Sequence, residues 1–276
     1  MLPNFLIIGA MKSGTTTLYH LLKCHPEIFM AENKEPQFFS DANKVDSSMA
    51  WYKSLFKGAN EAKAIGEAST NYTKYPLFKD VPELIKTHIP HAKLIYIIRN
   101  PIERIYSQFT HNYYIGRTDN DLNRVITQNR NYINISKYHM QLQKYLGVFE
   151  QRQIKVVLLE DLRDRPKEVV KDIYEYLDVD SVFVPSILNE RKHQTTNKSG
   201  RSGLLMKTLR NLPFYESVAN RLPEDIKGKL NSLFRSKIEP PKNMTAIEKL
   251  YLIDELGDDI ISLQSYLKRD LSAWLQ

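Results

Sequence analysis

The stretch that decides the fold is Asn4-Phe-Leu-Ile-Ile-Gly9-Ala-Met-Lys12-Ser13-Gly14-Thr15-Thr16-Thr17. Its apolar run lies between Pro3 and Gly9 and predicts a buried strand. Residues 15–23 carry leucines on one side and stop before Pro26, which predicts a helix. A loop between a strand and a helix directs backbone N–H groups and the positive end of the helix dipole toward one point. This junction therefore predicts a phosphate-binding site.

The loop also supplies side chains that suit an anion. Lys12 adds a positive charge, and the glycines allow the backbone to approach closely. The residues expected to bind the phosphate are Lys12, Ser13, Gly14, Thr15, Thr16 and Thr17. In nucleotide triphosphatases a lysine follows the second glycine, whereas here Thr15 follows Gly14. The nearest candidate for the aspartate that holds magnesium in those enzymes is Asp161, whose context equally fits a surface loop.

Further apolar runs at 64–67, 93–98 and 154–159 alternate with helical patterns, one of which opens at Asn100-Pro101 and another of which covers 167–177. This alternation predicts a three-layer α/β fold with a central parallel sheet. A stripe in 245–275 predicts one long packing helix; its members are Ile247, Leu250, Leu256, Ile260, Leu263, Leu267, Leu271 and Trp274. We expect a single domain over 1–276, with a helical C-terminal extension from about residue 204.

Composition narrows the class of protein. The 276 residues are 42% hydrophobic and 26% charged, which is typical of a globular protein, and 39 Lys+Arg against 32 Asp+Glu give a net charge of +7. No nucleic-acid motif or long run of like charge is present, so we expect no nucleic-acid partner. The lone Cys24 cannot form an internal disulfide, and residues 5–11 are too few to span a membrane. We expect a cytoplasmic protein without membrane insertion.

A second segment complements the phosphate loop. It reads Ile95-Tyr-Ile-Ile-Arg99-Asn-Pro-Ile-Glu-Arg104-Ile-Tyr-Ser107. Arg99 ends a predicted strand, at the edge where open α/β sheets bind ligands, and its guanidinium suits a phosphate. On the following helix, Arg104, Ser107 and His111 share the face opposite the apolar stripe, which leaves Ser107 free to reach a ligand.

Residues 9–17 resemble the 5′-phosphosulfate loop of the sulfotransferases that use 3′-phosphoadenosine 5′-phosphosulfate (PAPS). Residues 95–107 resemble that family's 3′-phosphate segment, in which Arg99 and Ser107 would grip the phosphate. The segment Lys34-Glu35-Pro-Gln37-Phe-Phe39 resembles the Lys-Glu-Pro-His-Phe-Phe segment of heparan-sulfate and related carbohydrate sulfotransferases, with Gln37 replacing histidine. Residues 66–72 resemble the segment that lines the acceptor cleft. The resemblance covers nearly the whole chain and implies a soluble, bacterial-like sulfotransferase with a P-loop-like fold.

The resemblance also implies roles. PAPS would be the donor and its desulfated form, PAP, the product, with no metal required. Lys12 would stabilise the leaving phosphate, and Glu35 would be the catalytic base, unless it is an ordinary surface glutamate. Glu67 would share that role or orient the acceptor, or else be a structural carboxylate, and His111 would touch the sulfuryl group or the acceptor unless it is simply packed or solvated. A nucleotide lid would provide Arg191, Lys198, Ser199, Gly200 and Arg201.

The acceptor is expected to be a hydroxyl or amine of a carbohydrate or of a small-molecule metabolite. Residues 115–135 predict either an acceptor lid or an ordinary surface loop. Two other functions stay open from the residues alone. One is a magnesium-dependent P-loop kinase of small molecules, and the other is a non-catalytic protein that binds phosphorylated ligands.

Overall fold

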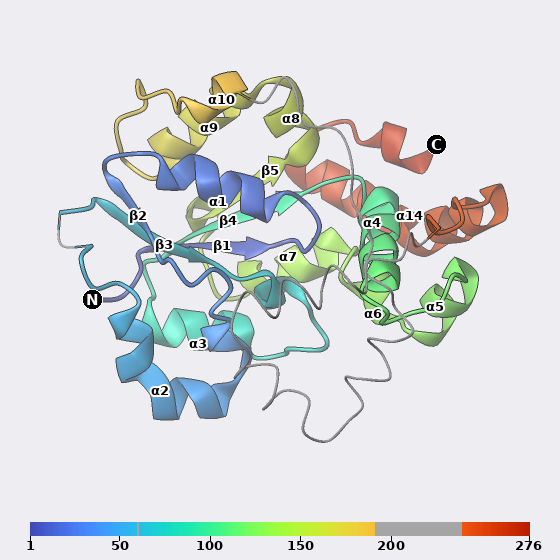
Figure 1. Ribbon diagram of the computed structural model, residues 1–276, viewed down its shortest axis with the longest axis horizontal. Coiled ribbons are helices and arrows are strands. Elements are labelled where there is room, and N and C mark those ends of the chain that lie inside the picture. The colour runs from blue at the N-terminus through green and yellow to red at the C-terminus, as the bar shows by residue number, and fades with distance from the viewer. Residues whose placement is uncertain (60, 191–238) are drawn as a thin grey trace, which may run out of the picture.

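The computed structural model describes residues 1–59, 61–190 and 239–276, and a five-stranded parallel sheet forms its centre (Figure 1). The strands are β1 (Phe5–Gly9), β2 (Ile28–Met30), β3 (Ala64–Ala68), β4 (Lys93–Ile98) and β5 (Ile154–Leu158), in the order β2-β3-β1-β4-β5. All the strands expected from apolar runs are confirmed to within one residue. Strand β2 was not predicted, because three residues do not make a recognisable run. Since every pair is parallel, all carboxyl ends share one edge.

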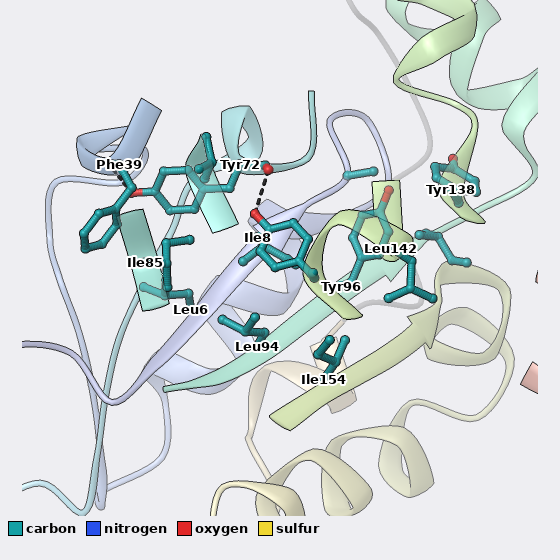
Figure 2. Packing of buried hydrophobic residues seen from close by; sticks show 14 of the residues in the cluster. Leu6, Ile8, Phe39, Tyr72, Ile85, Leu94, Tyr96, Tyr138, Leu142 and Ile154 are labelled. Atoms are coloured by element: carbon teal, nitrogen blue, oxygen red, sulfur yellow. Dashed lines mark hydrogen bonds between the residues drawn. The ribbon is translucent and has the colours of Figure 1, made fainter. Parts of the chain in front are cut away.

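Side chains that alternate along the strands supply two cores, one on each face of the sheet. Phe5 and Ile7 pack with α1 (Thr15–Lys23) and α9 (Pro166–Tyr176). Leu6 and Ile8 point the other way, into a cluster shown in Figure 2. The helices that contribute to this second core include α3 (Val81–His88), α4 (Pro101–Tyr114), α7 (Tyr138–Leu146) and α14 (Ala246–Leu267). The predicted three-layer α/β architecture is confirmed.

Shorter elements connect these layers. They are η1 (Phe38–Ser40), α2 (Ala42–Ser54), η2 (Thr70–Thr73), α5 (Leu122–Gln128), α6 (Asn131–Asn134), η3 (Gln151–Gln153), α8 (Leu159–Asp164), α10 (Ile187–Glu190) and η5 (Ser272–Leu275). About half of the segment 115–135 is therefore helical, in α5 and α6, and Leu122 and Ile126, four residues apart on α5, both bury their side chains. In the described part of the chain, no helix combines the length and the apolar character that a membrane crossing requires.

The C-terminal helix is shorter than predicted. It begins at a capping box between Thr245 and Glu248 and ends at Leu267, where Lys268 has a left-handed φ of 50°. Leu271 and Trp274 are nevertheless buried, because η5 returns to the core. The expected packing of Ile247 and Leu250 is wrong: both are exposed, and the buried stripe runs through Leu252, Leu256, Ile260 and Leu263. The single-domain organisation stays a prediction, because much of the C-terminal extension lies outside the described residues.

Candidate active site

The loop between β1 and α1 has the geometry of an anion site. Gly14 is the N-cap of α1 with a φ of 91°, and the first turn of α1 carries no acidic residue. Lys12 also lies in the left-handed region, with a φ of 68°, and Ser13 N–H closes a turn onto the Ala10 carbonyl at 3.1 Å. The first N–H groups of a helix have no acceptor within it. The loop therefore directs donors to the carboxyl edge of the sheet, as the sequence predicted.

The two glycines of the loop are also required by contacts within the protein. A Cβ on Gly9 would lie 2.0 Å from Thr73 Oγ1, and one on Gly14 would lie 2.6 Å from Leu159 Cδ1. Thr73 Oγ1 donates to the Ile8 carbonyl at 3.1 Å, which fastens η2 to the end of β1. The absence of side chains at these glycines thus lets the loop pack closely against η2 and α8. From the sequence, we expected only that they would let the backbone come close to a ligand.

The hydroxyl side chains of the loop lie in different environments. Ser13 is fully buried and Thr15 is buried, whereas Thr17 is half-buried and Thr16 is exposed. The Ser13 hydroxyl faces the buried Tyr138 hydroxyl, and hydrogen bonding between them acts to lower the pKa of Tyr138. The Ser13 side chain therefore lies on the protein side of the loop, and its expected contact with a ligand stays a prediction.

Arg99 joins the second predicted segment to the loop. Its Nη1 donates to the Lys12 carbonyl at 3.4 Å, and its Nη2 pairs with the Glu103 carboxylate on the next turn of α4. Asn100 caps α4 by accepting from Ile102 N–H at 3.0 Å, which confirms the predicted helix start. The structure thus brings together the two segments that were expected to bind one nucleotide.

Helix α4 carries the other three candidates from this segment. Ser107 is half-buried and His111 is exposed on the last turn, and their roles stay predictions. Arg104 was expected on the same helix face as these residues, opposite the apolar stripe, but this face is covered at Arg104, whose side chain is fully buried. The reason is a set of internal acceptors: Arg104 donates to Ser136 Oγ, to Gln108 Oε1 and to the Tyr132 carbonyl.

Glu35 presents an accessible carboxylate beside the end of β3. Its N–H donates to the Ala68 carbonyl at 2.9 Å, and its Oε2 accepts from Thr70 Oγ1 at 3.1 Å. Lys34 pairs with the other carboxylate oxygen at 3.2 Å, and the Glu35 side chain stays 31% exposed. Glu35 has a φ of 64°, a conformation that is uncommon outside glycine and concentrates at functional sites. The predicted base is therefore held in place and remains open to solvent.

Glu67 lies near the carboxyl end of β3, and its side chain is fully buried. Its carboxylate accepts hydrogen bonds from Tyr72 at 2.7 Å, Ser69 at 2.8 Å and Tyr52 at 3.3 Å. Burial raises the pKa of Glu67 to about 7, against the lowering effect of these hydroxyl donors. Ser69 Oγ also accepts from the Gln37 N–H at 2.9 Å. This arrangement favours a supporting part for Glu67 over direct contact with an acceptor.

Sequence reasoning missed Lys74 and its connection to the base. Lys74 Nζ donates to Asn71 Oδ1 at 2.6 Å, and Asn71 Nδ2 donates to Gln37 Oε1 at 2.7 Å. Burial lowers the pKa of Lys74, and the nearby Glu35 charge opposes that shift. An isolated lysine two residues past a recognised segment carries no sequence signal, so only the fold reveals this second cation near Glu35.

Two other expectations concern the kinase alternative and the nucleotide lid. Asp161, the nearest candidate for a magnesium ligand, pairs with Arg269 and with Arg165, and its hydrogen bonds to Arg269 lower its pKa. The proposed lid residues lie outside the described residues; they are Arg191, Lys198, Ser199, Gly200 and Arg201.

The residues at this edge fit a phosphate-bearing donor. Lys12 and Arg99 supply positive charge, and the buried Arg99 Nε lacks a hydrogen-bond partner in the described chain. Buried polar groups are normally satisfied, so this unused donor indicates a site that an anionic ligand would complete.

Comparison with known proteins agrees with this chemistry. A family model described as Sulfotransferase domain matches residues 2–210. A bifunctional heparan sulfate N-deacetylase/N-sulfotransferase 1 from Caenorhabditis briggsae is 29% identical over 201 residues, which cover 64% of this chain and 23% of that protein. A membrane-associated sulfotransferase, kil1, from Dictyostelium discoideum is 40% identical over 113 residues, which cover 39% of this chain and 22% of that protein. The chain therefore spans less than a quarter of the length of these two relatives.

A solved structure shares the fold along the whole chain. It is described as a sulfotransferase from Alicyclobacillus acidocaldarius, and it superposes with a TM-score of 0.73 at 24% sequence identity. The match covers 100% of both chains. The order of strands and the helices on both faces therefore follow an architecture already known from experiment.

Proposed function

Because this chain belongs to the sulfotransferase domain family, we propose that it transfers a sulfuryl group from PAPS to a hydroxyl or amine of an acceptor. The observation that carries the proposal is the meeting of two parts of the site at one sheet edge. Arg99 contacts the loop that holds Lys12, and Thr70 contacts Glu35 just beyond the neighbouring strand β3. One part suits a nucleotide donor, and the other provides a base for an acceptor.

The donor would be held by the phosphate loop and by α4. Backbone N–H groups at the start of α1 would bind the 5′-phosphosulfate, and Lys12 would stabilise negative charge on its phosphate. Arg99 and Ser107 would hold the 3′-phosphate, the arginine through its planar guanidinium. When bound, PAPS supplies an activated sulfuryl group. This work of positioning and electrostatic stabilisation resembles phosphoryl transfer.

Glu35 would remove the proton of the acceptor. Its side chain is partly exposed, while Thr70 and Lys34 restrict the orientation of the carboxylate. A base needs this combination, because it must reach the acceptor proton and must keep its geometry while it does so. Glu67 would act through Ser69, whose hydroxyl contacts both the Glu67 carboxylate and the backbone of the Glu35 loop.

The acceptor would be a carbohydrate or another small polyhydroxyl or amine metabolite. The relatives named for heparan sulfate support a glycan, and the chain's own Lys34–Phe39 segment resembles that of carbohydrate enzymes. Lys34 and Gln37 donate to the Glu35 carboxylate, and Lys74 lies near enough to feel its charge; such a polar, donor-rich surrounding suits hydroxyl-rich acceptors.

The direct test is transfer of radiolabelled sulfate from PAPS to a panel of oligosaccharides and small alcohols or amines. We expect labelled product and PAP in equal amounts with at least one acceptor, and loss of both in Glu35→Gln. Phosphorylation of the same panel by Mg-ATP, with no transfer from PAPS, would instead identify a kinase.

A further inference from the structure

Arg104 is the largest fully buried side chain in the described part of the protein, and it carries a charge. Its Nε and Nη2 donate to neutral acceptors only, namely Ser136, Gln108 and the Tyr132 carbonyl. Its Nη1 is buried and has no partner among the described residues. No carboxylate in the described ranges forms a salt bridge with it.

A buried guanidinium without an anion is unfavourable, because removing a charge from water is costly unless an opposite charge compensates. Burial lowers the pKa of Arg104 to about 10, so the group still carries its proton at neutral pH. The neighbouring Arg99 adds to the local positive charge instead of offsetting it. Arg104 is therefore a buried positive charge that the described residues around it do not neutralise.

The surroundings of Arg104 lead to the phosphate loop. Ser136, which accepts from Arg104, also accepts from the Tyr138 N–H at 3.0 Å, so Tyr138 at the start of α7 lies next to the Arg104 partners. Burial raises the pKa of Tyr138, and the Arg104 charge and hydrogen bonding with the Ser13 side chain oppose that shift. The Tyr138 ring packs edge-on against Tyr96 of β4 with centroids 6.0 Å apart (Figure 2). Ser13 Oγ, the Tyr138 hydroxyl and Arg104 Nη1 are all buried; the first two interact with each other, and Arg104 Nη1 has no hydrogen-bond partner among the described residues. These three groups form the Arg104 cluster, which lies under the loop.

We propose that Arg104 is a positioning residue for the donor, a buried cation whose charge is balanced by the anion that binds on the phosphate loop above it. The inference deepens the proposed function and rests on it for the identity of that anion. Arg104 acts without touching the ligand: its positive charge, held under the loop in a poorly polarisable interior, strengthens the attraction for a phosphate or sulfate. The buried charge destabilises the unliganded protein, and a bound anion offsets part of that destabilisation.

A purely structural arginine would behave differently. If Arg104 served only to tie α4 to Ser136 and Tyr132, a substitution would weaken folding and would affect ligand binding only in proportion to lost folding. If the charge of Arg104 is balanced by the ligand, a substitution should change ligand affinity and folding stability by different amounts. Loss of the charge weakens anion binding, while the stability of the unliganded protein depends on packing and hydrogen bonds.

The test compares Arg104→Lys, which keeps the charge, with Arg104→Gln, which keeps hydrogen-bonding capacity without it. Calorimetry measures affinity for adenosine 3′,5′-bisphosphate, and thermal unfolding measures the stabilisation produced by inorganic sulfate. We expect Arg104→Gln to bind the bisphosphate about tenfold or more weakly, the size of one charge interaction through a partly screened interior. Arg104→Lys should stay within about threefold of the wild type, and unliganded Arg104→Gln should melt no lower than unliganded Arg104→Lys.

Wild-type affinity in a folded Arg104→Gln protein would overturn the inference, as would equal losses in the lysine and glutamine variants. If Arg104→Gln does not fold, Arg104→Met takes its place, because apolar groups commonly replace buried charges without loss of stability. The sulfate measurement separates this inference from the proposed function. A wild-type protein that ignores the bisphosphate but is stabilised by sulfate contradicts PAPS as donor, while the Arg104 comparison remains decisive with sulfate.

Discussion

Arg99 Nη1 lies 3.4 Å from the carbonyl oxygen of Lys12, although 87 positions separate the two residues in the chain. The contact joins the turn after β4 to the turn after β1, the neighbouring strand of the sheet. Each turn alone is a common feature of α/β proteins. Together they form a site with two cationic side chains and a helix N-terminus, which suits a nucleotide that carries two phosphate groups.

Lys12 is expected to act on the transition state. Lys12→Ala should lower kcat by about 10²–10³, because a preorganised donor to developing charge is worth that much, while the affinity for the bisphosphate changes only a few-fold. Steady-state kinetics and calorimetry measure the two quantities. Lys23→Ala, in the exposed last turn of α1, is the matched control. Equal losses in kcat and in affinity would contradict a transition-state role.

Glu35 is expected to be the base. Glu35→Gln preserves shape and the hydrogen bond with Thr70, so bisphosphate affinity should be retained while activity falls by about 10²–10⁴. The exposed Glu32 provides the control Glu32→Gln. A fully active Glu35→Gln protein would show that Glu35 is not the base and would leave Glu67 or His111 as the candidate.

Glu67 is expected to make stability depend on pH. Its folded pKa of about 7 exceeds the unfolded value of 4.5, so the unfolded chain releases the proton first. Stability contributed by Glu67 therefore falls as pH rises from about 4.5 to about 7 and is constant above that, a change of about 3 kcal/mol. Because glutamine does not titrate, Glu67→Gln should gain about this much relative to the wild type between pH 4.5 and 8.

Urea unfolding of both proteins at several pH values measures this gain, and Glu61→Gln on the surface is the control. An unfolding free-energy difference between Glu67→Gln and wild type that does not change with pH would show that Glu67 is ionised in the folded protein throughout this range.

Glu103 is expected to compete with the ligand for Arg99. Arg99, just before α4, forms an ion pair with Glu103 in the first turn of that helix, and the Glu103 side chain is 55% exposed. An exposed pair of this kind is worth at most about 1 kcal/mol, so Glu103→Ala should raise bisphosphate affinity about two- to fivefold. Calorimetry at low salt measures the change, with Glu83→Ala on α3 as a control. Weaker binding in Glu103→Ala would show instead that Glu103 holds Arg99 in its binding position.

The sequence predicted most of the sheet, because runs such as 93–98 are apolar on both faces and buried strands require this. It did not predict β2 or α2, since a strand of three residues and a polar helix with a non-helical Ser48 produce little periodicity. The C-terminal helix was overextended because the apolar spacing continues through Leu271, beyond the left-handed Lys268 that ends the helix.

The sequence predicted those site residues that belong to local motifs and missed those that tertiary packing brings to the site. Lys12, Arg99 and Glu35 belong to local segments whose order in the chain already indicates their use. Lys74 and Tyr138 approach the site only through tertiary packing, so no local pattern could identify them. The burial of Arg104 was also not predicted, because its partners are distant in the chain: Tyr132 belongs to the segment 115–135, expected to be a lid or a surface loop, and Ser136 directly follows that segment.

The most direct test is a calorimetric titration of the protein with adenosine 3′,5′-bisphosphate and, separately, with ATP, each with and without Mg²⁺. We expect tight binding of the bisphosphate that does not depend on magnesium, together with weak binding of ATP. Preference for Mg-ATP over the bisphosphate would contradict the proposed sulfuryl transfer and would favour a kinase.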